Sequence, residues 1–148
     1  MIVVCAGAVF VVATGVALAA TLYTGSTSQD EAVALKSSGG AVTLFKLLLT
    51  EHCRNPSGGS TGSTAGHYTH RGRLGLNRFG HFFHRVAKRR LLTAQKNQRF
   101  NVTISFEGTV RGRHASGTFK GVFRFFTLSG RYVGSCTTGT VSWSAHSG

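Results

Sequence analysis

Acidic side chains are the scarcest charged groups in this sequence. Four carboxylates stand against 17 Lys and Arg in 148 residues, at Asp30, Glu31, Glu51 and Glu107. Glycoside hydrolysis needs two carboxylates beside one bond, and a nucleophilic triad needs a carboxylate that orients its base. Two of the four acidic residues are adjacent, so few such arrangements are left. We therefore expect no enzyme, no catalytic residue and no cofactor.

Proline is rarer still, with one residue in the chain. Pro56 opens the stretch NPSGGSTGSTAG, which is rich in Gly, Ser and Thr. Such a composition is typical of a flexible segment that forms no packed structure of its own. The sequence therefore predicts a flexible Gly/Ser loop over residues 55–66.

Motifs for metal binding are also missing, although the chain has seven histidines. HYTH contains His67 and His70, and HFFH contains His81 and His84. Residues three apart share a face on a helix but lie on opposite faces of a strand. Both motifs lie in predicted loop or strand, with no HExxH sequence and no cysteine cluster beside them. We expect no metal site.

Charge is absent from the first twenty residues, MIVVCAGAVFVVATGVALAA. The small-residue tripeptide ALA near the end of this run resembles the cleavage site of a secretory leader. A retained membrane helix over 2–22 is the alternative, because that length just spans a bilayer. We expect residues 1–20 to be a signal peptide, cleaved after Ala19 or Ala20, or an N-terminal membrane anchor. A single domain over 21–148 would then lie outside the cytoplasm, secreted or associated with the cell envelope.

Cysteine usage fits export. Removing the leader removes Cys5 and leaves the pair Cys53 and Cys136. Two such thiols usually pair in an oxidising compartment. We predict a disulfide between Cys53 and Cys136, with two free buried cysteines as the alternative.

Positive charge dominates the remaining sequence, with a formal net charge of +13 and a pI near 11.2. A protein of this charge attracts polyanions at long range. Basic residues are densest between Arg71 and Arg99. If the protein binds a polyanion, the expected contacts are Arg71, Arg73, Arg85, Lys88, Arg89, Arg90, Lys96 and Arg99.

Strict alternation of apolar and polar residues appears in the second half of the chain. From Asn101 to Val110 the apolar residues share one parity, which predicts a half-buried strand. After the turn-like RGRHASG, a second alternating strand is expected to form a hairpin with the first. Its segment KGVFRFF resembles an aromatic RNA-binding strand. The phenylalanines share the apolar parity with Phe119, so core packing is the favoured interpretation.

The closing stretch CTTGTVSWSAHSG holds the single tryptophan. Val141, Trp143 and Ala145 share one parity, and Ser and Thr take the other. A tryptophan that stacks on a ligand would more naturally lie on the polar parity or in a loop. We predict that Trp143 lies in the core and that this stretch is a scaffold strand.

The first half and the middle of the chain are less regular. EAVALKSSGGAVTLFKLLLTEHC predicts two strands joined at 38–40, the second so continuously apolar that it is expected to be covered. RGRLGLNRFGHFF predicts a short strand around Leu74 and Leu76, with a turn over 77–80. Residues 84–98 fit either a strand plus turn, which we favour, or a short cationic helix.

These patterns predict an all-β fold. We expect an antiparallel sandwich or barrel-like meander of about seven to eight strands, preceded by an N-terminal apolar leader helix.

Several short motifs occur in an order that resembles the order found in a known group of proteins. They are YTGSTSQ, VALKSSGGAVTLF, a central cysteine at Cys53, LGLNRFGHF, FEGTVRGRHASGTFKGVF and CTTGTVSWSA. Over Tyr23 to Ala145 the chain resembles a group of small exported proteins common in high-GC Gram-positive (actinobacterial) bacteria. The resemblance implies a compact antiparallel all-β domain with a secretory leader, and it implies no activity. The chain departs from the pattern between His81 and Arg99, where it is longer and more basic.

Two functions therefore remain. The first is a structural or passive exported β-domain without a dedicated ligand, which the sequence favours. The second is a binding module for anionic cell-envelope polymers, such as cell-wall polymers, or for extracellular nucleic acid. No specific nucleic acid is expected as a partner, and a membrane is expected only through the N-terminal segment if it stays uncleaved. Clustering of the basic residues on one side of the fold would favour the second function.

Overall fold

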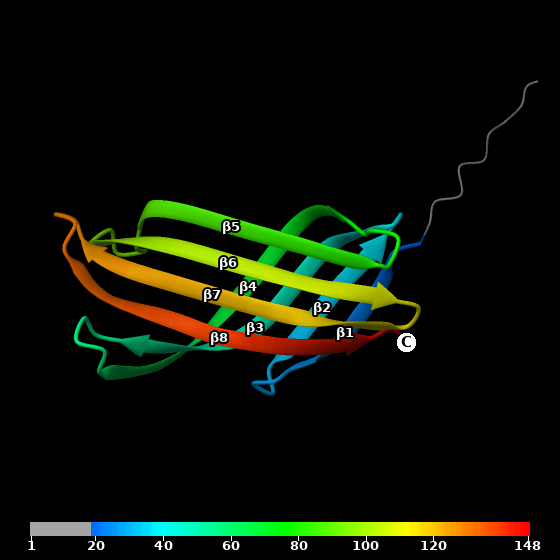
Figure 1. Cartoon of the computed structure of the whole chain (residues 1–148), viewed down its shortest axis with the longest axis horizontal. Helices are drawn as coiled ribbons and strands as arrows, with labels where there is room; N and C mark the ends of the chain where they lie inside the picture. The colour runs from blue at the N-terminus through cyan, green and yellow to red at the C-terminus, as the bar shows by residue number, and fades with distance from the viewer. Residues whose placement is uncertain (1–18) are drawn as a thin grey trace, which may run out of the picture.

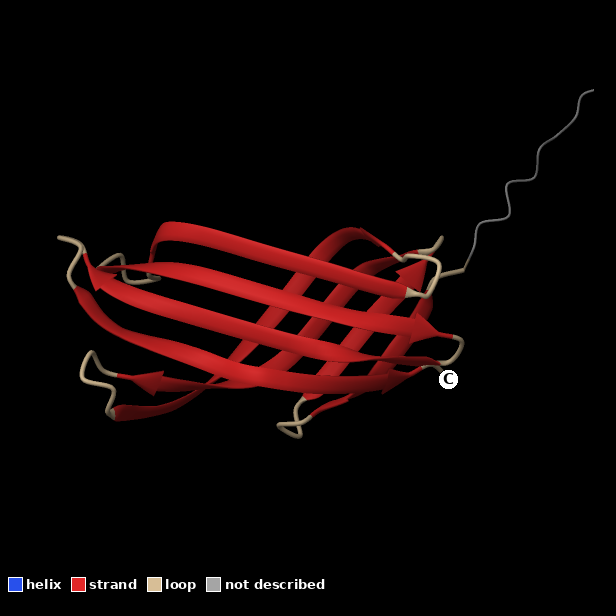
Figure 2. Cartoon of the chain, viewed as in Figure 1, coloured by secondary structure: helices blue, strands red, loops and turns tan. Residues whose placement is uncertain are grey.

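The computed structural model describes residues 19–148, which form antiparallel β-strands and the turns between them (Figures 1 and 2). The expected leader helix and Cys5 lie outside the described residues. Within the described part there is no helix, and so none that is long and apolar enough to cross a membrane.

Eight strands make up one sheet. They are β1 (Thr21–Thr27), β2 (Ala32–Ser38), β3 (Ala41–Arg54), β4 (Ser60–Gly75), β5 (His81–Leu92), β6 (Gln98–Arg111), β7 (His114–Thr127) and β8 (Tyr132–His146). The all-β, antiparallel prediction is confirmed.

The sheet consists of two four-strand meanders joined through β1 and β8. Its strand order is β4-β3-β2-β1-β8-β7-β6-β5, with a further pairing between β3 and β8. In Figure 1, β5 to β8 form one layer, and β1 to β4 cross behind it as a second layer. Strands β4 and β5 lie at the two ends of the strand order. The apolar faces of both layers therefore meet in a single core.

The predicted hairpins are present, with tighter turns. Gly39 and Gly40 join β2 to β3 with positive φ angles of 56° and 69°, a backbone conformation that glycine adopts without strain. The turn between β6 and β7 is formed by Gly112 and Arg113 alone. The expected turn RGRHASG is too long, because its last four residues already belong to β7. Ala115 among them is buried in the core.

The predicted loop over 55–66 is wrong beyond Gly59. From Ser60 onward the chain belongs to β4, which pairs with β3 along most of its length. The short strand expected around Leu74 and Leu76 is therefore the end of a much longer one. Gly, Ser and Thr here carry no apolar alternation, so backbone hydrogen bonds to β3 decide the structure instead of side-chain burial.

Strand β3 is covered on one face only, which corrects the expectation of a fully covered strand. Phe45, Leu47 and Leu49 point into the core, whereas Leu48 is 48% exposed on the outer face. A register shift between Val42 and Leu44 breaks the parity at the start of the strand.

Residues 84–98 form a strand plus turn, as favoured from the sequence. A bulge lies between Lys88 and Leu91, where one extra residue interrupts the pairing with β6. Val86 and Leu91 have opposite parities in the sequence, yet the bulge turns Leu91 back against the core. The patchy apolar stripe is thus the signature of a bulged strand.

Trp143 lies in the core, which confirms the prediction. It is 3% exposed, and its ring packs at tilted angles against Phe45 and Phe82. Its six-membered ring lies over Gly108 and Gly117, where an added Cβ would come within 2.5 and 2.7 Å of it. These two paired glycines give the indole its space.

The Cys53–Cys136 disulfide is present and joins the two layers. The two cysteines are directly opposite each other where β3 pairs with β8, and their S–S distance is 2.01 Å. They are 83 residues apart in the sequence. In the chain-entropy model, closing a loop of this length stabilises the fold by about 4 to 5 kcal/mol.

Replacing the tryptophan tests the core. We expect Trp143→Ala to lower the free energy of unfolding by about 3 to 5 kcal/mol, because it empties a large buried site. Denaturant unfolding followed by circular dichroism measures the loss.

Ser144→Ala is the matched control, because Ser144 is the exposed neighbour on the same strand. If Trp143→Ala fails to fold, Trp143→Phe should fold with a smaller loss. Equal stability of Trp143→Phe and the wild type would contradict the assignment of Trp143 to a tightly packed core.

Candidate polyanion-binding face

A hollow of about 670 Å³ lies on the outer face of β5, β6 and β7; we call it the outer hollow. Its lining is mixed, with basic, hydroxyl and small apolar side chains. The lining residues are Phe83, Arg85, Ala87, Lys88, Arg89, Asn101, Val102, Thr103, Ser105, Lys120, Val122 and Arg124.

Strand alternation explains why these side chains share one face. On β6, Val102, Ile104 and Phe106 point into the core, so the odd-numbered residues between them point outward. On β7, Phe119 is buried and its neighbour Lys120 is exposed. The sequence pattern that builds the core thus also builds the polar outer face.

The pairing register arranges the hollow as three rungs across the strands. Arg85, Ser105 and Lys120 are directly opposite one another and form the first cationic rung. Residues opposite each other on neighbouring strands point to the same face, so the three side chains are neighbours.

The neutral rung comes next along the strands and consists of Ala87, Thr103 and Val122. The second cationic rung is centred on Asn101, with Arg124 opposite it on β7 and the bulge of β5 on the other side. The hollow therefore has a neutral centre between two charged ends.

The bulge in β5 positions Arg89. Arg90 has a positive φ of 57°, and its backbone N–H donates to the Asn101 side-chain oxygen at 2.9 Å. This hydrogen bond holds the extra residue in place opposite Asn101. Arg89 shares the parity of Arg85 and points outward like it, and the bulge that follows returns Leu91 to the core side.

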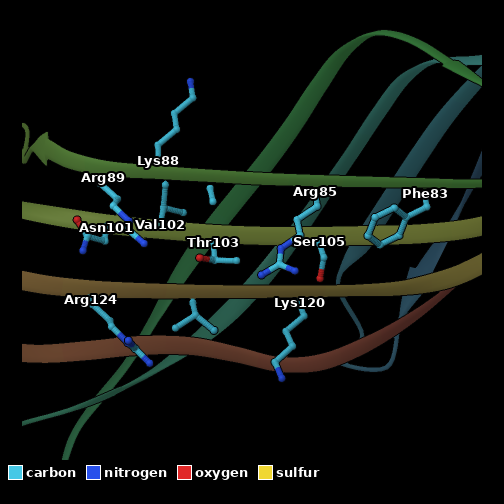
Figure 3. Close-up of a pocket in the computed structure, with 12 residues that line it drawn as sticks. Phe83, Arg85, Lys88, Arg89, Asn101, Val102, Thr103, Ser105, Lys120 and Arg124 are labelled. Carbon is cyan, nitrogen blue, oxygen red and sulfur yellow. The ribbon is translucent and has the colours of Figure 1, made fainter.

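Figure 3 shows how the long side chains extend. Arg85 and Arg89 reach from β5 over β6, while Lys120 and Arg124 reach from β7 toward β8. Lys88 points away from these four. The charged groups thus form two rows that run along the strands.

No carboxylate balances these charges inside the hollow. The four acidic residues all lie in the described part of the chain, and none lines the hollow. Glu107 is on the same face of β6, beyond Ser105, where its carboxylate lies 3.7 Å from the His81 ring. The outer hollow is therefore a strongly positive surface.

The predicted polyanion contacts separate into two groups. Arg85, Lys88 and Arg89 border the outer hollow, and of these Lys88 points its side chain away from it. The other five lie elsewhere on the surface, at Arg71, Arg73, Arg90, Lys96 and Arg99.

Besides Arg90 in the bulge of β5, two of these five have local structural roles. Arg73 of β4 donates to the Gly39 carbonyl oxygen at 2.7 Å, across the neighbouring turn. Lys96 lies in the turn before β6, with a positive φ of 56°.

Lys120 and Arg124 also line the outer hollow and are not among the residues predicted from the sequence. Their signal was present, because the alternation in KGVFRFF assigns both to the solvent face. Basic residues are densest along the chain between Arg71 and Arg99, whereas the hollow collects its charges across neighbouring strands.

The histidine pairs meet in an unexpected combination. His70 of β4 and His84 of β5 pack together, with ring centroids 4.4 Å apart, and both contact Phe106. They bridge the two end strands of the sheet order. Among residues 19–148, no group of three or more His, Cys, Asp or Glu side chains is placed to hold a metal ion.

Burial shifts the pKa of three ionisable side chains. Burial lowers the pKa of His70 from its ordinary value of 6.5, and the nearby His84 lowers it further. The His70 Nε2 atom is shielded from solvent and has no hydrogen-bond partner. Burial raises the pKa of Glu51 and of Tyr68, whose ring packs against Phe106 and Phe119.

Comparison with known proteins gives no relative. No protein-family model matches the chain, and no curated protein or solved structure matches it.

The stability of the fold should fall as the pH is lowered through the titration of His70. Its pKa is lower in the folded state, so below about pH 6.5 the unfolded chain binds more protons and gains stability. We expect His70→Gln to show a smaller loss of melting temperature between about pH 7.5 and about pH 5.5 than the wild type.

His67→Gln is the control, because His67 is exposed on the outer face of the same strand. It should keep the wild-type pH dependence. If His70→Gln and His67→Gln both follow the wild type, His70 does not contribute to the pH dependence of stability.

Proposed function

We propose that this protein is an exported module that binds an anionic polymer in the outer hollow. One observation carries the proposal: four of the 17 Lys and Arg side chains, those of Arg85, Arg89, Lys120 and Arg124, extend over a single hollow that no carboxylate lines. Clustering on one face favours a binding module over a passive β-domain.

The chemistry of the hollow suits a polyanion. Arginine donates pairs of parallel hydrogen bonds to phosphate or carboxylate groups, and three of the four cations are Arg85, Arg89 and Arg124. The net charge of +13 attracts a polyanion before contact is made. Hydroxyl and amide groups of β6 lie between the charges and can hydrogen-bond the polymer.

Export of the protein rests on two observations. The Cys53–Cys136 disulfide is compatible with an oxidising compartment, because reducing conditions in the cytoplasm keep thiols free. The apolar segment over 1–20 resembles a leader with a cleavage site. An envelope polymer would be accessible to the protein there.

Charge removal in the outer hollow tests the binding. We expect Arg85→Gln with Lys120→Gln to weaken binding to anionic polymers by about tenfold or more. It should also lower the slope of log affinity against log salt by about one to two, because each charge releases a counterion. Binding of teichoic acid, heparin and DNA is measured at two salt concentrations.

Lys36→Gln with Lys46→Gln is the matched control. Both lysines are exposed on β2 and β3, and the variant loses the same two charges. It should keep most of the affinity. Equal weakening by both double variants would mean that the charge of the whole surface, and not the outer hollow, attracts the polymer.

The mass of the protein in the culture medium tests export and cleavage of the leader. Protein recovered from the culture medium should lack residues 1–19 or 1–20, since the leader is cut after Ala19 or Ala20. Intact-mass measurement gives the cleavage position. Full-length chain found in the membrane fraction would contradict cleavage.

A further inference from the structure

The neutral rung divides the outer hollow into two charged ends. Ser105 and Asn101 are four residues apart on β6, which places the two cationic rungs about 13 Å from each other. Within each rung, β5 and β7 are two strand spacings apart, or about 10 Å. A chain lying along β6 would therefore meet positive charge at intervals.

Hydrogen-bonding side chains follow the centre of the hollow. Ser105, Thr103 and Asn101 point outward along β6. The Asn101 oxygen is engaged by the Arg90 backbone, so its amide N–H₂ donors face the hollow. Both cationic rungs continue onto β8 as hydroxyl residues, with Thr140 opposite Lys120 and Ser135 opposite Arg124. Hydroxyl groups on a ligand would find partners across the whole face.

A stacking surface for nucleic-acid bases is missing from the hollow. Single-stranded nucleic acids are held by aromatic side chains on which successive bases stack. The one aromatic residue that lines the hollow is Phe83, at one end and 57% exposed. Phe119 is in the core and Phe123 packs against it, so neither can stack with a ligand outside.

We infer that the ligand of the outer hollow is a hydroxyl-rich polymer with repeating anionic groups, a polyol or sugar chain, and not a nucleic acid. The inference rests on the proposed function. The two cationic rungs bind the anionic groups, and Thr103 between them hydrogen-bonds the uncharged part of the chain.

The first test compares polymers of equal charge at one salt concentration. The probes are poly(glycerol phosphate), inorganic polyphosphate, which has no hydroxyl groups along its chain, and single-stranded DNA. We expect poly(glycerol phosphate) to bind at least about threefold tighter than the other two, because one net hydrogen bond corresponds to such a factor. Polygalacturonate shows whether carboxylates replace phosphates, and tight binding of either hydroxyl-rich polymer supports the inference.

Length dependence gives a second readout. A fragment too short to reach both cationic rungs should bind at least about tenfold more weakly than one that spans about 13 Å, because the second contact becomes intramolecular. A smooth increase with charge alone, without a step at that length, would contradict the two-rung geometry.

Thr103→Val separates hydroxyl recognition from charge. The variant keeps a β-branched side chain on an outer strand face and removes the hydroxyl. We expect it to weaken the binding of poly(glycerol phosphate) about threefold or more and to leave the binding of polyphosphate unchanged. Thr109→Val, farther along the same face of β6, is the matched control and should change neither.

Failure of the inference and failure of the function give different results. Equal or tighter binding of polyphosphate or DNA, with no effect of Thr103→Val, overturns the inference and leaves the polyanion-binding function. Absence of binding to any of these polymers overturns both.

Discussion

The pairing of β8 with both β1 and β3 is the constraint on which the rest of the structure depends. Each four-strand meander has one apolar face and would expose it alone. Because β8 pairs with β7 on one side and with β1 and β3 on the other, the two layers become one sheet folded over a common core. The Cys53–Cys136 disulfide lies at the β3–β8 contact, so it holds the layers together where the backbone ladder is short.

Aromatic rings fill the core, and the charged hollow lies outside it. Phe45 stacks on Phe106 with ring centroids 4.7 Å apart, and Trp143 packs beside Phe45. The charged hollow lies on the other side of the same strands, which hold its side chains in register. The proposed binding would depend on a sheet that fixes the register and on long side chains that extend above it.

Sequence patterns predicted the strands where parity runs unbroken and failed where it does not. Alternation predicted β6, β7 and the core position of Trp143 in β8, because every second residue of these strands points into the core. Bulges between Val42 and Leu44 and between Lys88 and Leu91 reverse that parity, so the solvent face of β3 could not be assigned and a short helix remained the alternative to the favoured strand at β5. Strand β4 has Gly, Ser and Thr at its start and is defined by a partner strand that the sequence does not reveal. The lining of the hollow could not be predicted for the same reason. The register that places Lys120 in line with Arg85 is set by strand pairing in the sheet, which the sequence does not reveal.

The scarcity of carboxylates connects binding to stability. Arg85, Lys120 and Arg124 share one hollow that no acidic side chain lines, so like charges repel one another across it in the folded state. A bound polyanion would remove that repulsion in the folded chain, where the rungs are assembled, and much less in the unfolded chain, where they are not. The ligand would therefore raise the stability of the fold by mass action. Under the proposed function, the scarcity of acidic groups would thus make the sheet a surface that anionic polymers stabilise.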